Sequence, residues 1–299
     1  MKTNILFSIV IPTYNRADLI METLDTIFKQ TYRNYEILVV DNCSTDNTET
    51  MLQPLVNEGR VKYIRHDRNY ERSKSRNTGM ENATGDYLSF LDSDDFMYPS
   101  CLQDAAGFIM ANPEIKFFQN LYELVNNDRQ KIYAYKFPSL KNQYEALANG
   151  NFISCIGGFL HKEIYTQFRF AEDSKLIGSE DYDVWFKILA RYKMGRVSKV
   201  NCGVREHINR SVNHGVFETL NYQKDTVLNN IKKDPVTLQK FKPYLGRLEA
   251  SFNLQQTIVS NGLKNKKQSF YSMLQAIRID PAIIFTLRFA KIFYNTIKS

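Results

Sequence analysis

Short apolar segments alternate with segments of helical spacing along the first third of the chain, and this alternation limits the fold more than any other feature. The apolar segments are Ser8–Ile11, Glu36–Val40, Val61–Ile64 and Tyr87–Leu91, and the helical patterns between them cover 17–28, 45–56 and 73–83. Buried runs joined in this way are typical of an open parallel sheet with helices on both faces. The sequence therefore predicts an α/β fold with a Rossmann-like, mostly parallel sheet.

The second half of the chain is less regular. Strand-like runs at 115–118, 121–125 and 132–137 and a helix over 179–192 complete the predicted α/β domain, which we place at residues 1–220. Residues 221–299 are helical in pattern and hold 13 Lys and Arg against 4 Asp and Glu, whereas residues 1–220 hold 26 against 28. The net charge of +7 thus belongs to a helical C-terminal extension.

Composition narrows the class of protein. A hydrophobic share of 43% and a charged share of 24% are ordinary for a globular protein. We expect no leader segment, and no apolar run approaches the roughly 20 residues that span a bilayer. The four cysteines lie far apart with no CxxC pair, which disfavours a disulfide framework or a zinc site. We therefore expect a cytoplasmic protein.

Polar side chains follow several of the predicted strands. They are Thr13, Tyr14, Asn15, Asp41, Asn42, Asn69 and the run Asp92-Ser93-Asp94-Asp95. In open α/β sheets, ligands bind at the carboxyl ends of the strands. We therefore expect these side chains to converge on one site.

The run Asp92-Ser93-Asp94-Asp95 places three carboxylates within four residues. They repel one another unless solvent or a cation lies between them, and Mg²⁺ or Mn²⁺ prefers such oxygen ligands together with diphosphate oxygens. An acidic loop or a helix N-cap would have the same composition. The pattern alone leaves both interpretations open.

Three further positions could carry chemistry. Asp181 and its neighbour Glu180 open a predicted helix, where a carboxylate could be a general base for a hydroxyl or could simply cap the helix. His207 could bind a metal or a phosphate, or be structural. Arg76 could neutralise a diphosphate or lie on a helix surface. Spacing does not separate these alternatives.

Five segments, taken in their order along the chain, favour the functional interpretation of these residues. They are Ser8–Arg16, Val39–Asp46, Ser75–Gly79, Gly85–Asp95 and Glu180–Trp185. Their order and spacing resemble the family 2 inverting glycosyltransferases of GT-A fold over residues 6–215. The resemblance implies a metal-dependent enzyme, with Mn²⁺ or Mg²⁺, that moves a sugar from a nucleotide-diphosphate donor, a UDP-sugar, to a hydroxyl acceptor. It also implies work on a glycan in bacterial surface glycan assembly, such as O-antigen or capsule, and the acceptor would be a lipid-linked saccharide if the basic C-terminal helix contacts a membrane.

The same resemblance implies a nucleobase pocket. Pro12, Thr13, Tyr14 and Asp41 look like its residues, with Asp41 accepting the uracil imide hydrogen and Tyr14 packing on the ring. The family's common Asp-Asp-Gly-Ser is Asp41-Asn42-Cys43-Ser44 here, so Cys43 replaces a glycine and its conformational freedom.

Roles at the diphosphate follow in the same way. Asn69 and Arg76 resemble residues that line the nucleotide and the diphosphate, and Ser93 lies within the matching acidic motif. Asp92 is similar to the family carboxylate near the ribose and the metal.

For the metal and the chemistry, the resemblance implies that Asp94 is the direct metal ligand of the DXD motif and His207 a further ligand. Asp181 resembles the catalytic base of a single in-line displacement. Glu180 is similar to residues that position the acceptor or the base.

The end of the chain is basic and amphipathic. Asp280-Pro281 has the form of a helix start, and the helix that follows places Arg288, Lys291 and Lys298 on one stripe among apolar side chains. Residues 276–299 could contact an anionic membrane at its inner face, pack on their own domain, or pack on a second subunit of a homo-oligomer. No nucleic-acid-binding motif is recognisable, so we expect no nucleic-acid partner.

Two other functions fit part of the pattern. A sugar-nucleotide nucleotidyltransferase also combines an α/β sheet with a bound metal, but Pro12-Thr13-Tyr14-Asn15-Arg16 lacks its Gly-rich loop and lysine. A non-catalytic sugar- or membrane-binding module would not need Asp92, Asp94 and Asp181, which are all present.

Overall fold

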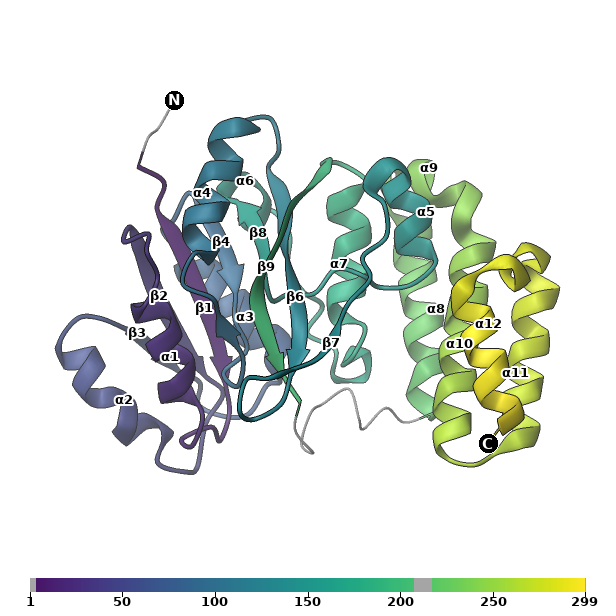
Figure 1. Cartoon of the computed structure of the whole chain (residues 1–299), viewed down its shortest axis with the longest axis horizontal. Helices are drawn as coiled ribbons and strands as arrows, with labels where there is room; N and C mark the ends of the chain where they lie inside the picture. Colours follow the sequence, from purple (N-terminus) through teal and green to yellow (C-terminus); the bar gives the residue numbers. More distant parts are fainter. Residues whose placement is uncertain (1–3, 207–216, 299) are drawn as a thin grey trace. The chain divides into compact units, whose positions relative to one another are not determined.

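A computed structural model describes residues 4–206 and 217–298 (Figure 1). The described chain forms two compact units, one built from 4–137, 153–174 and 192–206 and the other from 138–152, 175–191 and 217–298. The second unit therefore takes segments from before residue 220 as well as the C-terminal helices. The functional division into residues 1–220 and 221–299 stays a prediction.

The first unit contains a mixed sheet, which has nine strands within the described residues. The strands are β1 (Phe7–Thr13), β2 (Tyr35–Asp41), β3 (Lys62–Arg65), β4 (Tyr87–Phe90), β5 (Phe96–Met97), β6 (Phe117–Val125), β7 (Lys131–Ala134), β8 (Gly158–His161) and β9 (Met194–Arg205). Their order is β3-β2-β1-β4-β8-β6-β9-β5, and β7 pairs with β6. The helices are α1 (Ile20–Phe28), α2 (Thr48–Asn57), α3 (Arg72–Asn82), α4 (Cys101–Ala111) and α6 (Lys162–Tyr165).

The four strands predicted from the apolar runs are confirmed, and they pair in parallel as β3-β2-β1-β4. Beyond β4 the sheet is mixed, because β8 runs antiparallel to both β4 and β6, while β6 and β9 are parallel. The runs expected as separate strands at 115–118 and 121–125 form the single strand β6. The α/β fold predicted from the sequence is therefore confirmed, with a parallel N-terminal half.

The register of the parallel strands sets the position of the site. Thr13 at the end of β1 lies opposite Asp41 at the end of β2. Val10 of β1 lies opposite Phe90, the last residue of β4, so the chain leaves β4 toward the same edge of the sheet. Polar side chains that follow β1, β2 and β4 therefore gather at one carboxyl edge, as such sheets require.

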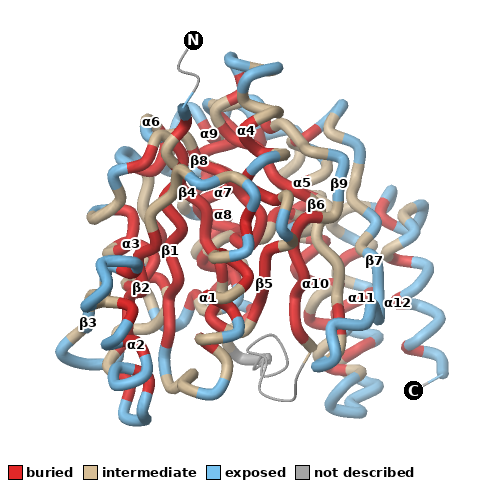
Figure 2. The backbone as a smooth tube through the Cα atoms, turned by 60° about the vertical axis from the view of Figure 1, so that its left-hand side comes forward, coloured by how far each residue is buried: buried red, intermediate tan, exposed pale blue. Residues whose placement is uncertain are grey.

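An apolar core packs against this sheet. Every residue of β1 is buried (Figure 2), and Phe7 and Phe118 both pack on Phe159, with ring centroids 5.6 and 5.0 Å apart. Leu24 and Ile27 of α1 join the same cluster. Burying side chains of this size contributes about 1.5–3 kcal/mol each, which fixes the strands that carry the polar edge.

The second unit is helical in its described residues. Its elements are η1 (Leu140–Asn142), α5 (Gln143–Ala148), α7 (Glu180–Leu189), α8 (Phe217–Lys233), α9 (Pro235–Phe241), η4 (Lys242–Tyr244), α10 (Leu245–Gly262), α11 (Lys266–Ile279), η5 (Pro281–Phe285) and α12 (Leu287–Lys298). Leu254, Met273, Phe289 and Ile292 share a core between α10, α11 and α12. Within the ranges described, no helix has both the length and the apolar character needed to cross a membrane.

Candidate functional site

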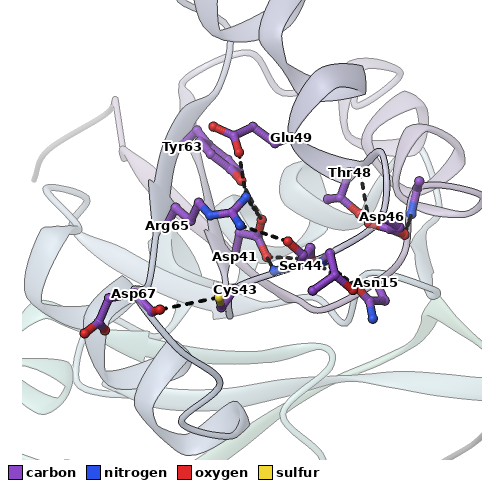
Figure 3. A network of polar contacts seen from close by, with 12 residues as sticks. Asn15, Asp41, Cys43, Ser44, Asp46, Thr48, Glu49, Tyr63, Arg65 and Asp67 are labelled. Carbon is purple, nitrogen blue, oxygen red and sulfur yellow. Dashed lines mark hydrogen bonds and ion pairs between the residues drawn. The ribbon is translucent and has the colours of Figure 1, made fainter.

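Asp41 is the centre of a buried polar network at the end of β2 (Figure 3). Its Oδ1 accepts hydrogen bonds from the backbone N of Ser44 at 2.9 Å and from the Ser44 hydroxyl at 2.6 Å. Its Oδ2 accepts from the Tyr63 hydroxyl at 2.5 Å and lies 3.9 Å from Nη1 of Arg65. Burial and this carboxylate together raise the pKa of the Tyr63 phenol. Asp41 is fully buried, and three protein donors hold its carboxylate in place.

The loop after Asp41 is strained where glycine is missing. Cys43 has a φ of 68°, in the left-handed region that disfavours side chains. Arg65 donates to the carbonyl of Ser44 at 2.9 Å, and Asn15 accepts at 2.8 Å from the backbone N of Thr45. These contacts keep the glycine-like turn although Cys43 occupies it.

Asn69 belongs to a second set of loop contacts. Its Oδ1 accepts from Nδ2 of Asn42 at 2.7 Å and from the backbone N of Glu71 at 3.0 Å. His66 bridges Asn42 and Thr78, with ring nitrogens 3.1 and 3.0 Å from their side-chain oxygens. The exposed Asn69 is thus fixed beside the loop that carries Asp41, while its contact with a nucleotide stays a prediction.

The end of β1 presents the other residues of the predicted base pocket. Pro12 and Thr13 are buried, whereas Tyr14 is 42% exposed. Within the described part of the chain, the buried Thr13 hydroxyl has no hydrogen-bond partner. An unsatisfied buried hydroxyl is uncommon, and it leaves a polar group available at this edge.

The acidic run after β4 lies among arginines. Nη2 of Arg76, on α3, is 3.4 Å from Oδ1 of Asp92, and Nε of Arg16 is 3.4 Å from Oδ2 of Asp94. The Arg76 side chain is only 4% exposed, while that of Asp92 is 42% exposed. Two cations from different segments therefore offset the repulsion within the run.

Backbone contacts hold the same loop in place. The Thr23 hydroxyl of α1 donates to the carbonyls of Ser93 and Asp95 at 3.0 and 2.9 Å. Asp95 is buried and accepts at 2.8 Å from the backbone N of Arg205, which ties the loop to the end of β9. Ser93 is also buried, so its predicted contact with the donor stays a prediction.

Arg205 completes this edge of the site. Its Nη2 donates to Oε2 of Glu22 at 2.7 Å, and the guanidinium holds the pKa of the Glu22 carboxyl below its usual range. Arg205, Arg16 and Tyr63 received no role from the sequence. Arg16 is the last residue of the segment Ser8–Arg16, Arg205 lies outside the five segments, and no local signal in the sequence indicates their acidic partners.

The carboxylates at the start of α7 have different surroundings. Oε2 of Glu180 accepts from the backbone N of Gly178 at 2.6 Å, and the side chain is buried. Oδ1 of Asp181 accepts from the backbone N of Tyr182 at 2.7 Å and from Nδ2 of Asn151 at 3.1 Å, and the residue is half-buried. Glu180 thus stabilises the turn before α7, and Asp181 is the more accessible carboxylate.

Metal binding at this site depends on few described ligands. Asp92 and Asp94 supply hard carboxylate oxygens of the kind that Mg²⁺ and Mn²⁺ prefer. His207, the third predicted ligand, lies outside the described residues. Over residues 4–206 and 217–298, no three His, Cys, Asp or Glu side chains are grouped as a ready metal site. The chemistry of the two carboxylates fits a cation that takes its remaining ligands from elsewhere.

Comparison with known proteins identifies the chain. The model of the family "Glycosyl transferase family 2" matches residues 8–168. The chain belongs to glycosyl transferase family 2. It is 31% identical over 198 residues, covering 66% of this chain and 74% of the relative, to the Escherichia coli enzyme UDP-Glc:alpha-D-GlcNAc-diphosphoundecaprenol beta-1,3-glucosyltransferase WfgD. Like its relatives, this family 2 member is a glycosyltransferase.

Another relative of this family 2 chain carries a name that refers to colanic acid biosynthesis. The putative colanic acid biosynthesis glycosyl transferase WcaA of E. coli K12 is 24% identical over 285 residues, covering 93% of this chain and 95% of the relative. Some relatives are longer, and the chain spans 44% of an uncharacterized glycosyltransferase of Rickettsia conorii.

Solved structures confirm the fold of the family 2 domain. S. aureus TarS 1–349 in complex with UDP-GlcNAc has a TM-score of 0.68 at 21% identity, covering 98% of this chain and 88% of that one. The mannosyltransferase PcManGT of Pyrobaculum calidifontis, in complex with GDP-Man and Mn²⁺, has a TM-score of 0.59 at 19% identity, with coverage of 98% and 79%. Both likenesses establish the GT-A architecture.

Proposed function

We propose that this glycosyltransferase moves a sugar, with inversion, from a UDP-sugar to a hydroxyl of a glycan or lipid-linked saccharide in bacterial surface glycan synthesis. The observation that carries the proposal is the pairing of Asp92 with Arg76 and of Asp94 with Arg16 at the edge where Asp41 and Thr13 end their strands. A donor of this class needs a base pocket beside a site that handles a diphosphate. This edge offers residues for both.

Asp41 and Thr13 supply the base pocket in this proposal. Three donors hold the Asp41 side chain in place, and a carboxylate has lone pairs for a further N–H donor. The unpartnered Thr13 hydroxyl provides a second polar contact. Tyr14 is exposed enough to pack on a ring.

Arg76 and Arg16 provide fixed positive charge for the departing diphosphate, because charge-assisted contacts of guanidinium with phosphate oxygens are strong. Asp92 and Asp94 would hold the cation, Mn²⁺ or Mg²⁺, with His207 as a further ligand. When bound, the cation would act as a Lewis acid toward the leaving diphosphate. The Mn²⁺ present with PcManGT supports a divalent metal in this fold.

Asp181 is the base in this proposal. The acceptor oxygen bonds to the anomeric carbon, the bond from that carbon to the diphosphate oxygen breaks, and the acceptor proton passes to Asp181. Its exposure and its place in the first turn of α7 favour it over the buried Glu180, which is engaged with Gly178. Glu180 then acts by shaping the turn that carries the base. Family membership favours this activity over a nucleotidyltransferase or a binding module.

The exposed side chains near the end of the chain support a location of this enzyme at the inner face of a membrane. Phe289, Ile292 and Thr296 of α12 are buried in the helical core, but Phe285 and Leu287 are 87% and 91% exposed. Exposed apolar side chains continue along the helix at Phe293, Tyr294 and Ile297, and Lys291 and Lys298 are exposed beside them. A helix that keeps a second apolar arc next to lysines is typical of contact with an anionic bilayer.

Vesicle sedimentation tests this contact with the full chain. We expect binding to vesicles that contain phosphatidylglycerol, weak binding to phosphatidylcholine vesicles, and loss of binding in Phe285→Ser/Leu287→Ser. The control is Leu263→Ser, whose side chain is 67% exposed outside α12. Equal binding by the wild type and the double variant would contradict a membrane role and leave a second subunit as the partner to seek by light scattering.

A donor panel tests the transfer function. Thermal shifts with UDP-, GDP- and dTDP-sugars, with and without Mn²⁺, should single out a UDP-sugar and depend on the metal. Asp94→Ala should remove the metal dependence. Release of nucleoside diphosphate when acceptor is added distinguishes transfer from nucleotidyl transfer or mere binding, and its absence with every donor and acceptor tried would count against the proposal.

A further inference from the structure

The loop after α5 joins the C-terminal helices to the start of α7. Nδ2 of Asn151, an exposed residue, donates to Oδ1 of Asp181 at 3.1 Å. α5 and α7 are also tied where the Tyr182 hydroxyl donates to the carbonyl of Leu147 at 2.5 Å. The conformation of this loop therefore sets the position of the Asn151 amide, which donates the hydrogen bond to Asp181.

Two arginines from the C-terminal helices hold the loop at Asn149. Nη1 of Arg288, on α12, donates to the Asn149 carbonyl at 2.5 Å and to the Ser251 hydroxyl at 2.5 Å. Nη1 of Arg247, on α10, donates to Oδ1 of Asn149 at 3.0 Å. The Ser251 hydroxyl also reaches the Asn149 carbonyl, at 3.0 Å. One residue of the loop thus receives three donors from two helices.

Gly150 lets the arginine come this close. It has a φ of +151°, and a Cβ there would lie 2.7 Å from Nη1 of Arg288. Any side chain at this position would push the guanidinium from the Asn149 carbonyl. In the sequence Asn149-Gly150-Asn151, the first residue is held by the arginines, the second leaves room for the Arg288 guanidinium, and the third donates a hydrogen bond to Asp181.

Arg288 is placed for this contact rather than for the surface. The sequence puts it on a stripe with Lys291 and Lys298, yet its guanidinium turns inward and is also 3.2 Å from Oε1 of Gln255. Burial lowers the pKa of Arg288. A cation drawn inward onto neutral acceptors costs free energy, and in some proteins such a cost is retained where it fixes one geometry.

We infer that Arg288 and Asn151 are positioning residues for Asp181, so that the C-terminal helices set the orientation of the catalytic base. This inference rests on the proposed function, in which Asp181 takes the acceptor proton. Through Asn149 and Gly150, Arg288 fixes the loop, and Asn151 then holds one carboxylate oxygen and leaves the carboxylate in one rotamer. Geometry of this kind acts on turnover rather than on donor binding.

Steady-state kinetics test the inference in the full chain, with the sugar nucleotide selected by the thermal-shift panel and water as acceptor. We expect Asn151→Ala and Arg288→Ala to lower kcat about ten-fold while donor KM stays within about two-fold. Arg288→Lys keeps a donor for the Asn149 carbonyl and should recover most of the rate. The control is Arg278→Ala on α11, an exposed arginine, which should match the wild type.

The outcomes separate this inference from the proposed function. If Asp181→Asn, assayed beside them, keeps the wild-type kcat, the role of the base is wrong. If Asp181→Asn is inactive but Asn151→Ala keeps the wild-type kcat, the positioning role alone is overturned. Should Arg288→Ala lose thermal stability, Asn151→Ala still decides, because it removes an exposed side chain.

Discussion

Gly79 of α3 packs directly against Val10 of β1, and α3 also carries Arg76. A Cβ at Gly79 would lie 2.2 Å from Cγ1 and 2.9 Å from Cγ2 of Val10. Carbon atoms in contact prefer about 3.5–4.0 Å, so Gly79→Ala must push α3 from the sheet by about 1.3 Å or distort Val10. Arg76, one helical turn away, would move with it from its place 3.4 Å from Asp92.

The magnitude follows from two opposing terms. Overpacking of a core contact costs about 1–3 kcal/mol, and alanine in a helix is about 1 kcal/mol better than glycine. Because the contact at Gly79 is so short, we expect the upper end of the cost, and a net loss of about 2 kcal/mol in the free energy of unfolding. A displacement of about 1 Å at Arg76 should also lower kcat by about 100-fold.

Urea denaturation and release of nucleoside diphosphate measure the two effects. The matched control is Gly107→Ala in α4, where no atom lies within 4 Å of the added Cβ, and which should gain up to about 1 kcal/mol. Val10→Ala removes the two methyl groups that clash, so the double variant should be more stable than the sum of the single changes predicts. Equal stability of the Gly79 and Gly107 variants, or strict additivity with Val10→Ala, would refute the close-contact account.

Two further predictions concern the loops around the base pocket. Cys43→Val should lower the free energy of unfolding by about 1–3 kcal/mol, because the backbone at this position already has a positive φ that a β-branched side chain disfavours. Cys43→Gly should stay within about 1 kcal/mol of the wild type, as measured by urea denaturation. An unchanged stability of the valine variant would contradict the strain at Cys43. Burial, with Lys74 nearby, lowers the pKa of His66 below its ordinary 6.5, so the unfolded chain binds the proton first as pH falls. The stability that neutral His66 contributes to the fold is therefore present above about pH 6.5 and is lost below it. Between about pH 7.5 and 5.5 the Tm of the wild type should fall further than the Tm of His66→Gln. Equal falls in Tm would exclude His66 as the cause.

The parallel half of the fold could be predicted because its evidence is local. Buried strands contain apolar runs such as Ile9–Ile11, and Asp41 and Asp92 lie at the carboxyl ends of strands that must end at the same edge. The resemblance to family 2 then supplied roles for most of these polar residues. The family and the fold are confirmed, while those individual roles remain predictions.

The contacts that could not be predicted from the sequence join residues that lie far apart along the chain. Tyr63 reaches Asp41 because β2 and β3 lie in a particular register, and Arg16 reaches Asp94 across two loops. No periodicity carries that information. The amphipathic pattern of the last helix likewise groups Arg288 with the lysines, although the acceptors on Asn149, Ser251 and Gln255 draw it inward.

The most direct test of the account compares Asp181→Asn with the wild type in two measurements, calorimetry with UDP and Mn²⁺ and the rate of nucleoside diphosphate release from the selected donor and acceptor. Loss of a general base costs about 10²–10⁴-fold in rate but should leave the donor pocket intact. We therefore predict nearly unchanged nucleotide affinity with turnover reduced by that factor. Weakened nucleotide binding with no separate loss of turnover would show that Asp181 is not the base.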